Sequence, residues 1–175
     1  MSAALIPRPE ATEYAPFYGA YISQVPVGDL LAILEEQRCD TQALLAALPE
    51  ARALHRYAPG KWSVKEVVGH LSDSERVFSY RALRFARGDA QPLAGFDEQA
   101  WVPAAGFDRR SLPDLLADLD AVRRATIALF RGFDAAALAR KGTANNREIT
   151  VRALAYIIAG HERHHAGILR ERYRV

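Results

Sequence analysis

The chain has 175 residues, half of them apolar, so it is long enough for one compact domain over residues 1–175 with a substantial core. Lysine and arginine number 23 against 21 aspartate and glutamate, and the net charge of +2 is too small to indicate a nucleic-acid partner. No stretch stays apolar over the roughly 18 residues of a membrane-spanning helix, and a lone Cys39 without a secretory signal favours a cytoplasmic protein.

The first 27 residues combine four prolines with four aromatic side chains. This mixture is too proline-rich for a long helix and too aromatic for a disordered tail, so we expect an arm that packs against the body. Leucine and isoleucine residues at helical spacing then predict the first long helix over residues 28–47, stopped near Pro49.

The second helix has the clearest predicted start. Ser63 is followed three residues later by Glu66, which is the pattern of a capping box, and Trp62 and Val67 are placed to pack around it. With Val67 at the centre of the buried face, His70 lies about 60° to one side and borders the core. The remaining residues of that face are Leu71, Ser74, Phe78 and Phe85.

Helical periodicity is lost over residues 88–110, where glycines and prolines interrupt the chain. We expect a long loop between the second and third helices, anchored by Phe96, Trp101 and Phe107. A loop of this length is often functional, so it is expected to line or cover the mouth of a site, with Asp97 and Trp101 as candidate contacts. For Trp101, a simple hydrophobic anchor is the favoured explanation.

Ser111 and Asp114 mark the start of a third helix that continues through Phe130 and ends at Gly132. A short helical turn over residues 134–139 and a polar connection over residues 141–148 are expected next. Thr150 is a candidate N-cap for the last helix, which continues to about Tyr173. Four long amphipathic helices without a run of alternating strand residues predict an all-α four-helix bundle.

Two histidines on the last helix point to chemistry. His161 and His165 are four residues apart, so at about 100° per residue they project from the same face, within an apolar stripe. Buried imidazoles need either hydrogen-bond partners or a metal ion, and both explanations are open for this pair. His70 on the second helix supplies a third imidazole. Three neutral imidazoles would leave one coordination position open, as in catalytic zinc sites.

The other histidines and Glu162 are assigned less specific roles. His164 lies about 100° from His165 and is expected at the rim, and His55 is expected to be a solvated surface residue. Residues 161–165 also match the His-Glu-x-x-His pattern of zinc proteases, whose glutamate acts as a general base. Because only ten residues follow His165, no downstream third ligand of the protease type is apparent. We therefore expect Glu162 to be an ordinary surface carboxylate.

Three blocks of the sequence resemble the DinB superfamily. They are residues 62–71 (WSVKEVVGHL), 96–101 (FDEQAW) and 160–167 (GHERHHAG), and their order is more specific than any one block. The resemblance covers most of the chain and points to the branch of YfiT-like metal-dependent hydrolases. It implies a four-helix bundle with a three-histidine site for nickel or zinc, at the matching positions His70, His161 and His165.

The same resemblance implies relatives that use low-molecular-weight thiols, namely bacillithiol S-transferases and a mycothiol-dependent maleylpyruvate isomerase, and a homodimer. One departure is that relatives often carry glutamine in a His-x-Gly-Gln segment, where this chain has Ile168.

Three functions follow as hypotheses. The first is an S-transferase that activates a thiol co-substrate as thiolate against a small electrophile, and the second is a metal-dependent hydrolase. The third is a non-catalytic metal-binding stress-response protein, whose coordination sphere would be closed by Asp73 or Glu75. A DNA-binding module is disfavoured because the basic residues are scattered.

Overall fold

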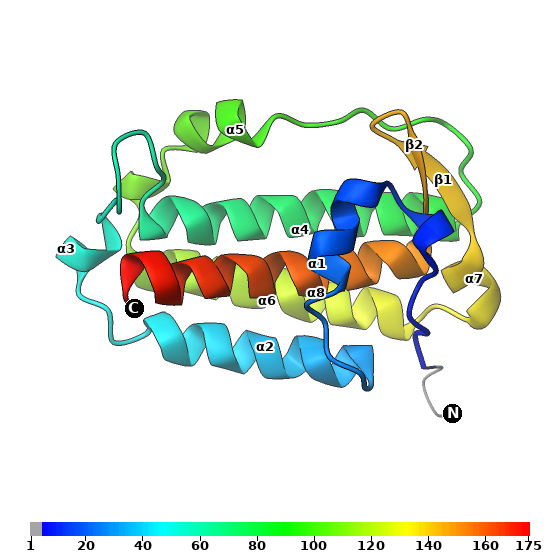
Figure 1. The fold of residues 1–175 in the computed structure, drawn as a ribbon, viewed down its shortest axis with the longest axis horizontal. Helices are drawn as coiled ribbons and strands as arrows, with labels where there is room; N and C mark the ends of the chain where they lie inside the picture. The colour runs from blue at the N-terminus through cyan, green and yellow to red at the C-terminus, as the bar shows by residue number, and fades with distance from the viewer. Residues whose placement is uncertain (1–4) are drawn as a thin grey trace.

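Four long helices form the bundle in the computed structural model, which describes residues 5–175 (Figure 1). They are α2 (Leu30–Leu45), α4 (Val64–Ala86), α6 (Leu112–Arg131) and α8 (Val151–Ile168). Both α2 and α4 pack against α6 and α8, so the four helices enclose a common interior. The predicted four-helix bundle is confirmed.

The N-caps that begin these helices are largely those expected from the sequence. Ser63 accepts from the Glu66 backbone N–H in a complete capping box, Ser111 caps α6, and Thr150 caps α8. Helix α2 begins later than predicted because Asp29 caps it, and a short α3 (Glu50–Ala53) follows Pro49. A π-helical turn, η4 (Leu169–Tyr173), continues α8 to the predicted end.

The interior contains two apolar clusters, one toward each end of the bundle. One includes the first half of α8 and the last half of α4, and the other includes the first halves of α4 and α6 with the end of α8. Buried polar side chains from all four long helices lie between the two clusters. We call this set the central polar layer; it consists of Gln37, Thr41, Glu75, Arg123 and Glu162.

The N-terminal arm packs against the body, as predicted. It comprises η1 (Ala11–Glu13), η2 (Pro16–Tyr18) and α1 (Gly19–Ile22), and α1 lies against α8 (Figure 1). This approach requires glycine at position 160, because a Cβ there would lie 2.1 Å from the Tyr21 carbonyl oxygen. The arm is also held by Glu13, which accepts hydrogen bonds from Thr150 and Arg152.

Two predictions about the connections need correction. The segment 88–110 contains a helix, α5 (Glu98–Ala105), and the turn η3 (Phe107–Arg109), although Pro103 and Gly106 indicated an irregular loop. Pro103 is tolerated because a helix of eight residues has few internal hydrogen bonds to lose. The segment 134–139 contains the expected short helix, α7 (Ala135–Ala139).

The polar connection after α7 is a β-hairpin and not the irregular segment expected from the sequence. Strands β1 (Lys141–Ala144) and β2 (Arg147–Thr150) pair antiparallel around Asn145 and Asn146, with φ of 50° and 59°. Asparagine tolerates this left-handed conformation, which a two-residue hairpin turn requires. The strands are too short and too polar to show an alternating pattern.

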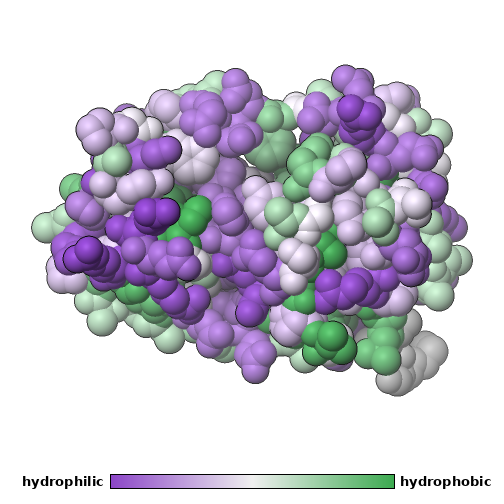
Figure 2. Space-filling model, in the orientation of Figure 1, coloured by the Kyte–Doolittle hydropathy of each residue, from purple (hydrophilic) through white to green (hydrophobic). Residues whose placement is uncertain are grey.

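The outer face shown in Figure 2 is mainly hydrophilic, with hydrophobic side chains scattered among the polar ones. None of the helices within residues 5–175 combines the length and apolar character needed to cross a membrane.

The ion pair between Glu13 and Arg152 predicts a measurable pH dependence. The hydrogen bond from Arg152 lowers the pKa of Glu13 from 4.5 to about 2, so the pair stabilises the fold above about pH 4.5 and this contribution is lost as pH falls toward 2. We expect Glu13→Gln to lower the free energy of unfolding by about 1–3 kcal/mol at pH 7 and by less than half as much at pH 3. Urea unfolding at both pH values measures this difference. Glu148→Gln, at an exposed carboxylate, is the control; an equal loss at both pH values would contradict the prediction.

Candidate metal centre

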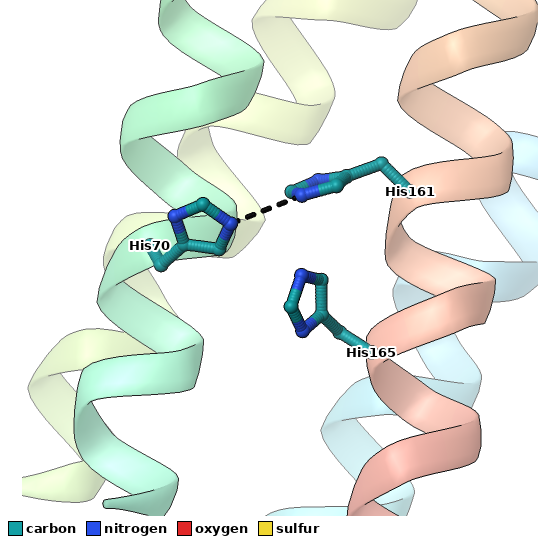
Figure 3. A group of neighbouring side chains, drawn as sticks. All are labelled: His70, His161 and His165. Carbon is teal, nitrogen blue, oxygen red and sulfur yellow. Dashed lines mark hydrogen bonds between the residues drawn. The ribbon is translucent and has the colours of Figure 1, made fainter. Parts of the chain in front are cut away.

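The three histidines singled out in the sequence converge in the structure. His70 projects from α4, and His161 and His165 project toward it from successive turns of α8 (Figure 3). The Nε2 atoms of His70 and His161 are 3.0 Å apart, and one ring nitrogen from each histidine lies within 4.8 Å of the others. Two helices that are distant in sequence therefore bring three nitrogen donors to one point.

These imidazoles are held in the neutral form. His70 and His161 are buried, and His165 is partly exposed. Burial lowers the pKa of His70 to about 4 and, together with the neighbouring imidazoles, lowers the pKa of His165 to about 3 and that of His161 well below its usual value. Neutral imidazoles have a free lone pair for a metal ion.

Aromatic side chains and one hydroxyl surround the histidines. Trp62 packs on His70 with ring centroids 4.7 Å apart, and Tyr21 from the arm packs edge-on against His161 at 5.4 Å. The Ser74 hydroxyl lies 3.4 Å from Nδ1 of His70, on the ring edge opposite the one that faces His161. This contact orients His70 so that its Nε2 atom faces the other imidazoles.

The donor set fits a divalent metal ion. Tetrahedral zinc with imidazole nitrogens at 2.0–2.1 Å places those nitrogens about 3.3 Å apart, close to the spacing of His70 and His161. Within residues 5–175, the group of converging ligands contains three histidines and no carboxylate. Three nitrogen donors leave a coordination position for a further ligand.

Two cavities that share no lining residue reach the three histidines. The larger, of about 290 Å³, is lined by His70 and His161 together with side chains from the arm and the segment before α5. The smaller, of about 190 Å³, is lined by His165, Trp62 and Ile168. Ile168 contributes an apolar wall to the smaller cavity.

The segment 88–110 does contribute to these cavities, though through other residues than expected. Phe96 and Glu98 line the larger cavity and Gln99 lines the smaller one. Asp97 instead caps α5 by accepting from the Gln99 and Ala100 backbone N–H groups. Trp101 is 44% exposed and packs against Phe96 with a centroid distance of 5.1 Å, which is the role of an anchor.

The two remaining histidines lie outside the converging group. His164 is partly buried at the edge of the cluster, where it packs against Tyr21, and His55 is exposed on the surface. Both positions agree with their predicted placement.

The prediction that Glu162 is a surface carboxylate is wrong. Its side chain is buried and accepts hydrogen bonds from Thr41 at 2.6 Å and Gln37 at 3.0 Å, while Arg123 lies 2.7 Å away. These partners belong to α2 and α6, whereas the histidine cluster faces α4. Glu162 is therefore engaged in the central polar layer and is not placed as a general base of the protease type.

The carboxylates proposed to close the coordination sphere are also engaged elsewhere. Glu75 forms two hydrogen bonds of 2.8 Å with Arg123, and Asp73 forms an ion pair with Arg76. Arg123 was not among the residues predicted to be functional, although its position in the sequence carries a signal. Arg123 falls on the buried face of α6 between Leu119 and Ile127, where a charge requires buried partners.

The chain belongs to the DinB superfamily. The model of that family matches residues 33–169, which include all three converging histidines. No curated protein matches the chain. Among solved structures, the chain is similar to YfiT from Bacillus subtilis, described as a probable metal-dependent hydrolase with an unusual four-helix bundle topology. The two share 20% identity with a TM-score of 0.73, over 95% of this chain and 91% of that one, a likeness of fold.

The engagement of Glu162 predicts a structural role. We expect Glu162→Gln to lower the free energy of unfolding by roughly 2–4 kcal/mol, because Arg123 loses one of its two buried carboxylate partners. Denaturant unfolding at neutral pH measures this loss, with the exposed Glu171→Gln as control. Unchanged stability would show that Glu162 is available for another role, such as proton transfer.

Proposed function

We propose that His70, His161 and His165 bind one divalent metal ion, zinc or nickel, and that the protein is an S-transferase acting with a low-molecular-weight thiol on a small electrophile. The single observation that carries the proposal is the convergence of three neutral imidazoles between two separate cavities. A bound divalent ion supplies Lewis acidity, which lowers the pKa of a thiol or a water molecule at the open position.

The protein residues supply the conditions for this chemistry. The three imidazoles contribute no negative charge, so they leave the full charge of the ion available. Ser74 orients His70, and Trp62, Tyr21 and Phe78 surround the imidazoles with aromatic surface that limits access of water. Low polarity around the ion strengthens its effect on the acidity of a ligand.

The two cavities favour transfer between two substrates. One cavity lies beside His165 and the other beside His70 and His161, so a thiol and an electrophile can approach the same point from different sides. In the reaction the sulfur forms a bond to the electrophilic carbon, the leaving group departs with its bonding electrons, and the thiol proton passes to solvent. A hydrolase needs space for only one organic substrate.

Hydrolysis is the second candidate, favoured by the structural similarity to YfiT and its description as a probable metal-dependent hydrolase. A non-catalytic metal-binding role has less support, because among residues 5–175 no carboxylate joins the three histidines. The cytoplasmic location, inferred from composition, stays a prediction. The homodimer, implied by the family resemblance, also stays a prediction.

Metal binding is tested by elemental analysis of protein purified without a nickel column. We expect about one zinc or nickel ion per chain in the wild-type protein. Metal binding should be weakened by at least roughly 10–100-fold in each of three variants, His70→Ala, His161→Ala and His165→Ala. That factor is typical for loss of a group that only orients a metal ligand, and loss of the ligand itself should cost at least as much. His55→Ala, at an exposed histidine, should retain the ion. Wild-type protein without metal, or a variant series that keeps it, would disprove the site.

The reaction is tested by offering metal-loaded protein an activated aryl chloride with a panel of small thiols. We expect conjugation faster than the background reaction, and we expect it to require both the thiol and the metal. His70→Ala should reduce the rate of conjugation by at least about 100-fold, as for loss of a principal stabilising group. Product formation is followed by absorbance and mass spectrometry. Absence of conjugation with every thiol, together with cleavage of small esters or amides without thiol, would favour the hydrolase instead.

A further inference from the structure

Arg81 is a buried cation in the wall of the larger cavity. It belongs to α4, is 3% exposed, and lines the same cavity as His70 and His161. Its Nη2 atom donates to the Ala94 carbonyl at 2.8 Å. The guanidinium lies near the rings of Phe78 and Phe96, at 5.9 and 5.7 Å from their centroids. The side chain is therefore fixed by α4 on one side and by the segment before α5 on the other.

This arginine has no carboxylate partner within residues 5–175, where no ion pair includes it. The other deeply buried arginine, Arg123, provides the contrast, because it pairs with both Glu75 and Glu162. Burial lowers the pKa of Arg81, whereas the two carboxylates overcome burial and raise the pKa of Arg123. A buried cation without an opposite charge is costly to maintain and is open to an anionic ligand.

Arg81 and His70 share one face of α4. His70, Ser74 and Phe78 are spaced by four residues and Arg81 follows three later, so all four lie along one stripe of the helix that lines the cavity. The Cα atoms of His70 and Arg81 are about 16 Å apart along the axis. Because helical side chains lean toward the N-terminus, Arg81 reaches back toward the histidines.

We propose that Arg81 binds a carboxylate of the substrate, so that the substrate of the three-histidine site is a small carboxylic acid whose reacting end lies at His70 and His161. The identity of the reacting end depends on the proposed function; the carboxylate site does not. A guanidinium presents two parallel N–H donors that match the two oxygens of a carboxylate. The cavity of about 290 Å³ limits the ligand to a small molecule.

Glu98 is a carboxylate in the same cavity that could compete with a ligand for Arg81. It lines this cavity from the first turn of α5, yet it forms no ion pair with Arg81. Burial raises the pKa of Tyr18 and of Tyr21, and the charge of Glu98 adds to the rise. Tyr18 also interacts with Arg81 through its hydroxyl, so the guanidinium has neutral hydrogen-bonding neighbours and, within residues 5–175, no opposite charge paired with it.

The test compares 3-phenylpropionate with its uncharged amide, 3-phenylpropionamide, by isothermal titration of both metal-loaded and chelator-treated protein. We expect wild-type protein to bind the carboxylate at least roughly tenfold more tightly, as for a hydrogen bond to a charged group. Arg81→Gln should remove this preference, and Arg81→Lys should retain part of it because the charge remains without the paired donors. Arg131→Gln removes an exposed arginine on α6 and should keep the full preference.

Several outcomes would overturn the proposal. One is equal binding of the carboxylate and the amide by wild-type protein. This comparison needs no variant, so it decides the proposal even if Arg81→Gln does not fold. An unchanged preference in folded Arg81→Gln would overturn the proposal as well. Inorganic phosphate displacing the carboxylate more effectively than acetate does would assign the site to a phosphate instead.

The proposed function can fail separately from this inference. Metal analysis of the histidine variants decides whether the three imidazoles hold an ion. The carboxylate preference of chelator-treated protein decides the role of Arg81. Protein that binds no metal and still prefers the carboxylate would support the anion site alone.

Discussion

The buried ion pairs of Arg123 are the constraint on which the rest of the structure depends. Arg123 on α6 contacts Glu75 on α4 and Glu162 on α8, and it lies between the two apolar clusters. Apolar contacts are not directional, so the clusters by themselves do not fix how far one helix is shifted along another. Each carboxylate is close in sequence to a histidine of the cluster, Glu75 to His70 and Glu162 to His161. Because an unpaired buried charge is costly, the three helices are held at the one register that pairs all of these groups. That register is also the one at which His70 meets His161.

The elements outside the bundle complete the site. Helix α1 can approach α8 because position 160 is a glycine, and this approach brings Tyr21 against His161. The segment before α5 supplies Phe96 to the larger cavity, which the arm also lines. A bundle of four helices alone would leave the histidines more accessible to water. The arm and the segment 88–110 cover the histidine cluster and supply walls to the two cavities beside it.

The distribution of charge around the cavities fits the proposed chemistry. Neutral imidazoles would leave a metal ion strongly positive, and Arg81 adds a second positive group in the wall of the larger cavity. An anionic substrate would be attracted by both, with its carboxylate at the arginine and its reacting end near the ion. The two carboxylates of the central polar layer share Arg123, which compensates part of their negative charge.

Local patterns in the sequence predicted the four helices, their caps at Ser63, Ser111 and Thr150, and the three histidines, since helical periodicity and capping depend on residues a few positions apart. Helix α5 and the β-hairpin were missed, because Pro103 obscured one and four-residue polar strands carry too little pattern for the other. Only the tertiary structure decided the roles of Glu162 and Arg81. The partners of Glu162 come from other helices, and Arg81 donates to a backbone carbonyl in the segment before α5. Such contacts between distant parts of the chain leave no spacing pattern in the sequence.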